Sequence, residues 1–79
     1  MLRPVTSEKA VKLIDLENTL IFVTYRRETI EAIGKEVSNL FKVKVEKVRT
    51  LTRGNKKYAY VKLSKENPAI DVATKIGMI

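Results

Sequence analysis

The sequence contains no cysteine and no histidine, and these two absences exclude several kinds of functional site. Without cysteine the chain can form no disulfide, no thiolate metal site and no thiol nucleophile. Without histidine it lacks the commonest general base and the commonest metal ligand at neutral pH. We therefore expect no catalytic residue, no metal site and no cofactor, and we expect that the protein is not an enzyme.

Long apolar segments are also missing. The longest unbroken apolar run is Leu20–Val23, whereas a membrane-spanning helix needs ~20 apolar residues. The first residues contain no apolar signal-peptide core. With 79 residues, the chain is expected to form one domain, 1–79, that is intracellular and monomeric when free.

The positive charge of the chain is concentrated in one segment. The sequence has 16 Lys and Arg against 9 Asp and Glu, which gives a net charge of +7. Residues 42–62 contain eight basic residues and one acidic residue, so this segment carries the entire excess. Such a field is typical of proteins that bind a polyanion, because each neutralised phosphate releases counterions. A lysine-rich strand edge that resists aggregation is the alternative, but nucleic acid is favoured.

Hydrophobic periodicity divides the chain into helices and strands. Helices are expected at about 8–16, 29–41 and 68–76, and strands at 19–25, 43–52, 57–64 and, in short form, 2–5. Thr6 or Ser7 is expected to cap the first helix and Asn67 the last, with Pro68 at its first position. The alternation slips near Glu46, which indicates a β-bulge.

These elements predict an α+β fold. Strand 19–25 is apolar on both faces, which is typical of a central strand that is covered on both sides. We expect a small antiparallel sheet of three to four strands with helices on both faces, in the order (β)α-β-α-β-β-α. The basic segment 42–62 then forms a β-hairpin around a turn at 53–56.

Two tyrosines accompany the cations of this hairpin. Tyr58 and Tyr60 share one face of the return strand, and Ala59 lies on the other. Aromatic rings between cations suit base stacking combined with phosphate neutralisation. Packing of one or both rings under a helix is the alternative.

Several short segments, in an order that covers nearly the whole chain, form a recognisable set. The N-terminal segments are Arg3–Val5, Ser7–Val11, Ile14–Asp15 and Glu17–Phe22, and the later ones are Leu40–Phe41, Val43–Val48, Thr50–Leu51, Ala59–Leu63, Asp71–Ala73 and Ile76–Gly77. Together they resemble the archaeal-type large-subunit ribosomal protein L23 family.

This resemblance implies a three-layer α/β/α domain of the cytoplasmic ribosome. Such a domain would bind large-subunit rRNA near the polypeptide exit tunnel, beside ribosomal protein L29, and would help to form the docking surface for signal recognition particle. The RNA-binding residues expected from the resemblance and from the charge pattern are Arg3, Thr6, Lys9, Arg49, Thr50, Arg53, Asn55, Lys56, Lys57, Tyr58 and Lys62.

Two other interpretations remain open. Segments 20–25 and 56–63 resemble the two conserved strands of an RNA-recognition motif, in which Tyr58 and Tyr60 would stack on single-stranded RNA. That motif needs a final strand after the last helix, and the sequence does not predict one. The third interpretation is an adaptor whose basic hairpin meets an acidic protein.

Overall fold

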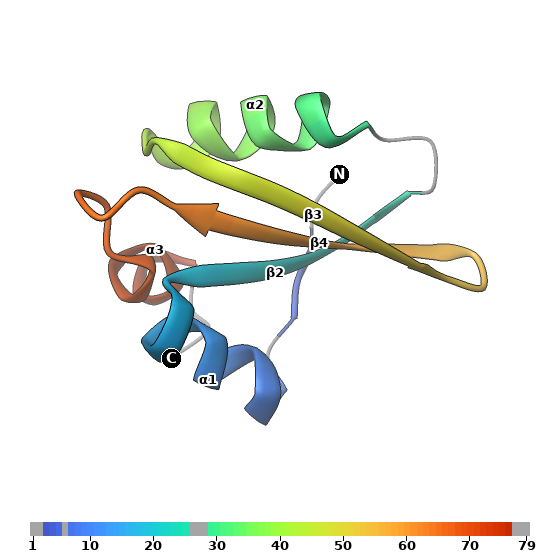
Figure 1. Ribbon diagram of the computed structural model, residues 1–79, viewed down its shortest axis with the longest axis horizontal. Helices are drawn as coiled ribbons and strands as arrows, with labels where there is room; N and C mark the ends of the chain where they lie inside the picture. The colour runs from blue at the N-terminus through green and yellow to red at the C-terminus, as the bar shows by residue number, and fades with distance from the viewer. Residues whose placement is uncertain (1–2, 6, 26–28, 77–79) are drawn as a thin grey trace.

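The computed structural model describes residues 3–5, 7–25 and 29–76 (Figure 1). Its elements are β1 (Arg3–Pro4), α1 (Glu8–Glu17), β2 (Thr19–Tyr25), α2 (Ile30–Phe41), β3 (Val45–Arg53), β4 (Lys56–Leu63) and α3 (Ala69–Lys75). This order confirms the predicted α+β fold, including the short first strand. Within the described residues, no helix is long and apolar enough to cross a membrane.

The four strands form one antiparallel sheet in the order β1-β2-β4-β3. β2 is central, as its two apolar faces predicted. In Figure 1, α2 lies next to β3, and α1 and α3 lie together next to β2. α1 packs against β2 and α3, and α2 packs mainly on β3. All three helices contribute buried residues to one cluster with Ala59, Val61 and Leu63 of β4. Much of the opposite surface of the β3–β4 hairpin is therefore clear of helices.

Short side-chain caps start the first two helices. The Ser7 hydroxyl accepts the Ala10 N–H at 3.3 Å, and the Thr29 hydroxyl accepts the Ala32 N–H at 3.1 Å. Each cap satisfies one of the backbone donors that a helix leaves unpaired in its first turn. The prediction of a cap at Thr6 or Ser7 is thus confirmed for Ser7, and Thr6 lies outside the described residues.

The core lies between one face of the sheet and the helices. β4 contributes Ala59, Val61 and Leu63, which are at most 1% exposed, and β2 contributes Leu20 and Phe22. The Phe22 ring stacks on Phe41 of α2 at a centroid distance of 6.2 Å. The helices supply the remaining buried members of the cluster, which are Ile14, Ile33, Val37, Ala69, Val72 and Ala73.

The predicted bulge lies between Val45 and Lys47, where the pairing of β3 with β4 shifts by one residue. Before the bulge Val45 pairs with Leu63, and after it Val48 pairs with Val61, so both valines face the core. Lys47 instead pairs with Lys62 on the opposite face. The extra residue therefore keeps the valines inside and turns Lys47 outward.

Asn18 joins the end of α1 to the start of α3. Its amide nitrogen lies 3.1 Å from the carbonyl oxygens of Leu63 and Ser64 and 3.2 Å from that of Asn67. Its side-chain oxygen accepts the Ala69 N–H at 2.6 Å. Asn18 adopts a left-handed conformation with φ of 51°, which asparagine tolerates better than most residues. One side chain thus satisfies backbone groups of a loop more than forty residues away.

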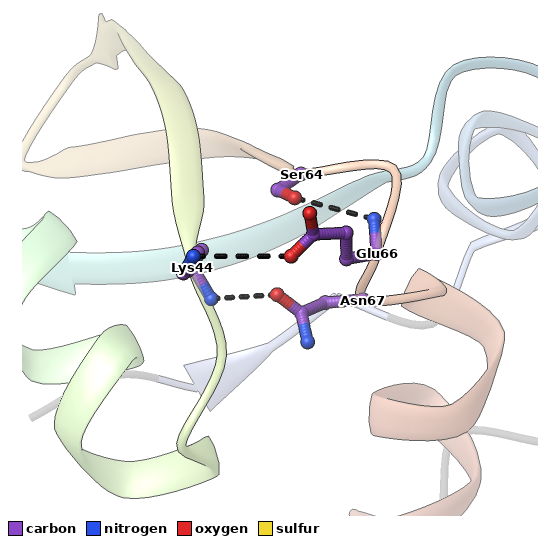
Figure 2. Close-up of polar contacts among 4 residues, drawn as sticks. All are labelled: Lys44, Ser64, Glu66 and Asn67. Atoms are coloured by element: carbon purple, nitrogen blue, oxygen red, sulfur yellow. Dashed lines mark hydrogen bonds and ion pairs between the residues drawn. The ribbon is translucent and has the colours of Figure 1, made fainter.

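The prediction that Asn67 caps the last helix is wrong. Pro68 directly precedes α3, and the Pro68 side chain forms no capping hydrogen bond. The Asn67 side-chain oxygen instead accepts the Lys44 N–H at 2.8 Å (Figure 2). Nearby, the Lys44 ammonium lies 3.8 Å from the Glu66 carboxylate. Asn67 therefore ties the loop before α3 to the chain entering β3, and Asn18 takes over the cap.

We expect Asn18→Ala to lower the free energy of unfolding by about 3 kcal/mol, because it removes a cap, several hydrogen bonds and a residue suited to positive φ. Asn18→Gly keeps the backbone conformation and should lose about 1 kcal/mol less. Urea unfolding measures both changes. Asn39→Ala, at an exposed position in α2, is the matched control and should change stability little. Equal effects at positions 18 and 39 would contradict the role of Asn18.

Gly34 and Gly54 should respond in opposite ways to alanine. A Cβ at Gly34, inside α2, would meet Val48 Cγ2 at 3.4 Å, an ordinary contact, so Gly34→Ala should stabilise the protein by roughly 0.5–1 kcal/mol. At Gly54 no atom lies within 4 Å, but φ is +59°, so Gly54→Ala should destabilise it by about 1 kcal/mol. Thermal unfolding tests both. A loss of stability in Gly34→Ala would show that the Val48 side chain cannot move to accommodate the added methyl group.

Candidate nucleic-acid interface

The outer surface of the β3–β4 hairpin brings most of its cations together. Alternation along both strands sends one set of side chains into the core and the other set outward. The outward cross-strand pairs, in order from the bulge to the turn, are Lys47 with Lys62, Arg49 with Tyr60, Leu51 with Tyr58, and Arg53 with Lys56. We call Lys47, Arg49, Arg53, Lys56 and Lys62 the basic face; all five are exposed.

The basic face has an electrostatic cost in the free protein. Lys47 lies directly opposite Lys62, and Arg53 lies directly opposite Lys56. Like charges in such positions destabilise a sheet. Among the described residues, no carboxylate forms an ion pair with any member of the basic face. The ion pair that these residues do form joins Lys44 to Glu66, outside the basic face. Glu17 lines a hollow with Lys47, Arg49 and Lys62 but forms no ion pair with them, so a bound anion would relieve repulsion that remains in the free protein.

Exposure increases across this surface from the centre of the sheet to its edge. Ile21 of β2 is 5% exposed, Tyr58 and Tyr60 of β4 are half-buried, and Leu51 of β3 is 44% exposed. The guanidinium carbon of Arg49 lies 6.0 Å from the centre of the Tyr60 ring, which is within range of a cation–π interaction. The two tyrosines are thus neither free in solvent nor packed under a helix.

Two shallow hollows flank Tyr60. The first is lined by Val5, Ser7, Lys9, Ile21, Leu51, Arg53, Tyr58 and Tyr60. The second is lined by Glu17, Thr19, Lys47, Arg49, Tyr60 and Lys62. Ser7 and Lys9, at the start of α1, border the first hollow. Glu17, at the end of α1, borders the second. The helix therefore limits the outer surface of the sheet on the β2 side.

The structure brings together most of the residues predicted to bind RNA. Arg49, Arg53, Lys56, Tyr58 and Lys62 lie on one face of the hairpin. Arg3, opposite Val23, is exposed on the same face of the sheet, and Lys9 lines the first hollow.

Three other predicted residues lie elsewhere, and one lies outside the described residues. Thr50 pairs with Ala59 and Lys57 with Thr24, so both project to the core side of the sheet and are half-buried. Asn55 is exposed in the turn. Thr6 is not among the described residues.

The sequence placed Tyr60 on this face with Tyr58 but did not include it among the RNA-binding residues, and it missed Lys47 and Leu51. Both missed residues alternate with Arg49 and Arg53 along β3, so periodicity counted from these arginines could have identified them. Counted from Val45 it fails for Lys47, because the bulge changes the phase between these two residues. Among the described residues, no three carboxylates gather to form a metal site.

The fold and the basic face define a class of protein: a small α+β domain that presents unpaired cations on one surface of a β-hairpin. The chain matches a family model described as "Ribosomal protein L23" over residues 1–70. It is 47% identical over 79 residues to "Large ribosomal subunit protein uL23" of Pyrobaculum aerophilum, which covers 98% of this chain and 96% of the relative. The protein of the same name from Methanothermobacter thermautotrophicus is 42% identical, covering 99% and 92%.

The chain therefore belongs to the ribosomal protein L23 family. This confirms the resemblance found in the sequence. It places the protein among structural proteins of the large ribosomal subunit and not among enzymes.

We expect Lys47→Glu to stabilise the free protein by up to about 1 kcal/mol, because it converts a like-charge pair with Lys62 into an opposite-charge pair. Lys47→Gln removes only the repulsion and should give a smaller gain. Urea unfolding at low salt measures both, and the difference from wild type should shrink at high salt. Identical stability of all three proteins at low salt would show that the charges do not interact across the strands.

Proposed function

We propose that this protein binds large-subunit rRNA through the basic face, as one rRNA-binding domain of the cytoplasmic ribosome. The observation that carries this proposal is the gathering of five exposed cations on one surface with no ion pair to a described carboxylate. Each phosphate that these cations neutralise releases counterions, which favours binding without base-specific contacts.

The dimensions of the basic face suit folded RNA. Arg53 follows Lys47 by six residue steps along β3, a span of about 20 Å at the ordinary rise of a β-strand. This is long enough to contact several phosphates in succession. Arg3, Thr6 and Lys9 extend the contact from the N-terminal segment, and Asn55 extends it from the turn of the hairpin. Thr50 and Lys57 lie on the other side of the hairpin, where they would meet only RNA that passes around its tip.

The helices remain available for protein neighbours. Leu16 of α1, Leu40 of α2 and Ile70 of α3 are large apolar residues with 79%, 62% and 39% exposure, and none belongs to the basic face. In our proposal the protein lies near the polypeptide exit tunnel beside ribosomal protein L29. Its outward surface contributes there to the docking of signal recognition particle.

A single-stranded RNA-binding role is the second candidate, because half-buried Tyr58 and Tyr60 occupy neighbouring outward positions on a central strand. The burial of Thr19 and Ile21 opposes it. In an RNA-recognition motif, the sheet surface is open across both central strands, whereas here the β2 side is closed.

The test is a titration of the protein with a folded fragment from the third domain of large-subunit rRNA at several salt concentrations. Arg53→Gln combined with Lys62→Gln should weaken binding and lower the dependence of log K on log salt by about 1.4–1.8, the contribution of two phosphate contacts. An unstructured strand of equal length should bind less tightly.

Lys35→Gln combined with Lys75→Gln is the matched control, because it removes two positive charges from α2 and α3 and leaves the basic face intact. Its salt dependence should equal that of the wild type. An equal loss in both double variants would show that net charge alone drives binding. Negligible binding of the wild type at low salt would exclude RNA and favour an acidic protein partner.

A further inference from the structure

We infer that the first hollow holds one unpaired base of a folded RNA. This inference rests on the proposed function, whose own evidence is the basic face and not the hollow. Its lining combines two aromatic rings, Tyr58 and Tyr60, with the apolar side chains of Val5, Ile21 and Leu51. Aromatic and apolar surfaces of this kind bind bases by stacking and contact. The rest of the lining is polar, from Ser7, Lys9 and Arg53. Phosphate binding alone gives no reason for the aromatic and apolar part of this hollow.

The hollow is smaller than a pocket for a drug-sized ligand, as a site for one base would be. Its volume is about 260 Å³, below the ~300–1,000 Å³ of pockets that hold drug-sized molecules. Leu51, at 44% exposure, is an apolar side chain held in solvent between Arg49 and Arg53. A base stacked against Tyr58 would cover the exposed part of Leu51, because the two residues are cross-strand partners.

Two cations line the hollow and could contact the phosphates that flank an inserted base. Lys9, in the first turn of α1, and Arg53, near the end of β3, both line it. Arg49 lies over Tyr60 from the neighbouring hollow. A nucleotide with its base in the hollow therefore has positive charge on both sides for its flanking phosphates.

The surroundings favour one base over a run of bases. Ser7 and Lys9 line the hollow beside Ile21, and Ile21 itself is only 5% exposed. A single strand crossing the sheet would meet this closed side after β4. A base that is bulged from a helix needs no such path, because the helix on either side can rest on the basic face.

Three RNA hairpins that differ at one position test the inference: one with a bulged adenosine, one with an abasic site at the bulge, and one fully paired. The bulged-adenosine hairpin should bind roughly tenfold to a hundredfold more tightly than the other two. The protein has three tyrosines and no tryptophan, so stacking should also quench its intrinsic tyrosine fluorescence. Combined Tyr58→Phe and Tyr60→Phe should keep the preference and lose the quenching.

Leu51→Glu and Thr52→Glu form a matched pair, because they add the same charge at adjacent exposed positions on opposite faces of β3. Only Leu51→Glu should abolish the preference for the bulged base. Equal affinity of the wild type for all three hairpins, with a steep salt dependence, would overturn the base site and leave the proposed function standing.

No binding to any hairpin or rRNA fragment at low salt would overturn both proposals. A saturable quench by adenosine monophosphate at the concentrations used for the hairpin would instead overturn the assignment to RNA, because it would identify the hollow as a site for free nucleotides.

Discussion

The strict alternation of side chains along β4 is the constraint on which the rest of this protein depends. Ala59, Val61 and Leu63 build the core from one face, while Tyr58, Tyr60 and Lys62 stand on the other. In so short a chain, one strand must therefore serve the fold and the interface at once. A slip of one residue would bury the cations and expose the core. The register of the hairpin is thus also the register of the candidate binding surface.

Two local devices maintain this register. The bulge between Val45 and Lys47 corrects the phase of β3, so that its valines meet the core and its cations line up with those of β4. Asn18 holds the far end of β4 in place by binding the carbonyl oxygens of Leu63 and Ser64 while it caps α3. The charge repulsion within the basic face is tolerated because these devices and the core stabilise the hairpin from its other side.

Much of the fold could be predicted from the sequence, because most of its signals are local. Periodicity located β2 without error and the helices to within a residue or two, and the broken alternation near Glu46 located the bulge. The prediction failed at Asn67. A capping residue is recognised by its sequence position, whereas Asn18 reaches α3 only because β2 and β4 pair side by side.

The sequence by itself determined the elements, the concentration of charge in residues 42–62 and membership of the ribosomal protein L23 family. Only the tertiary structure decided which of those cations share a surface. It put Lys47 on the face opposite Val45, paired with Lys62, it put Thr50 and Lys57 on the core side, and it placed the start of α1 beside Tyr58 and Tyr60. The physical reason is that a side chain's direction depends on strand register and on the packing of distant elements, and neither is encoded at the residue itself.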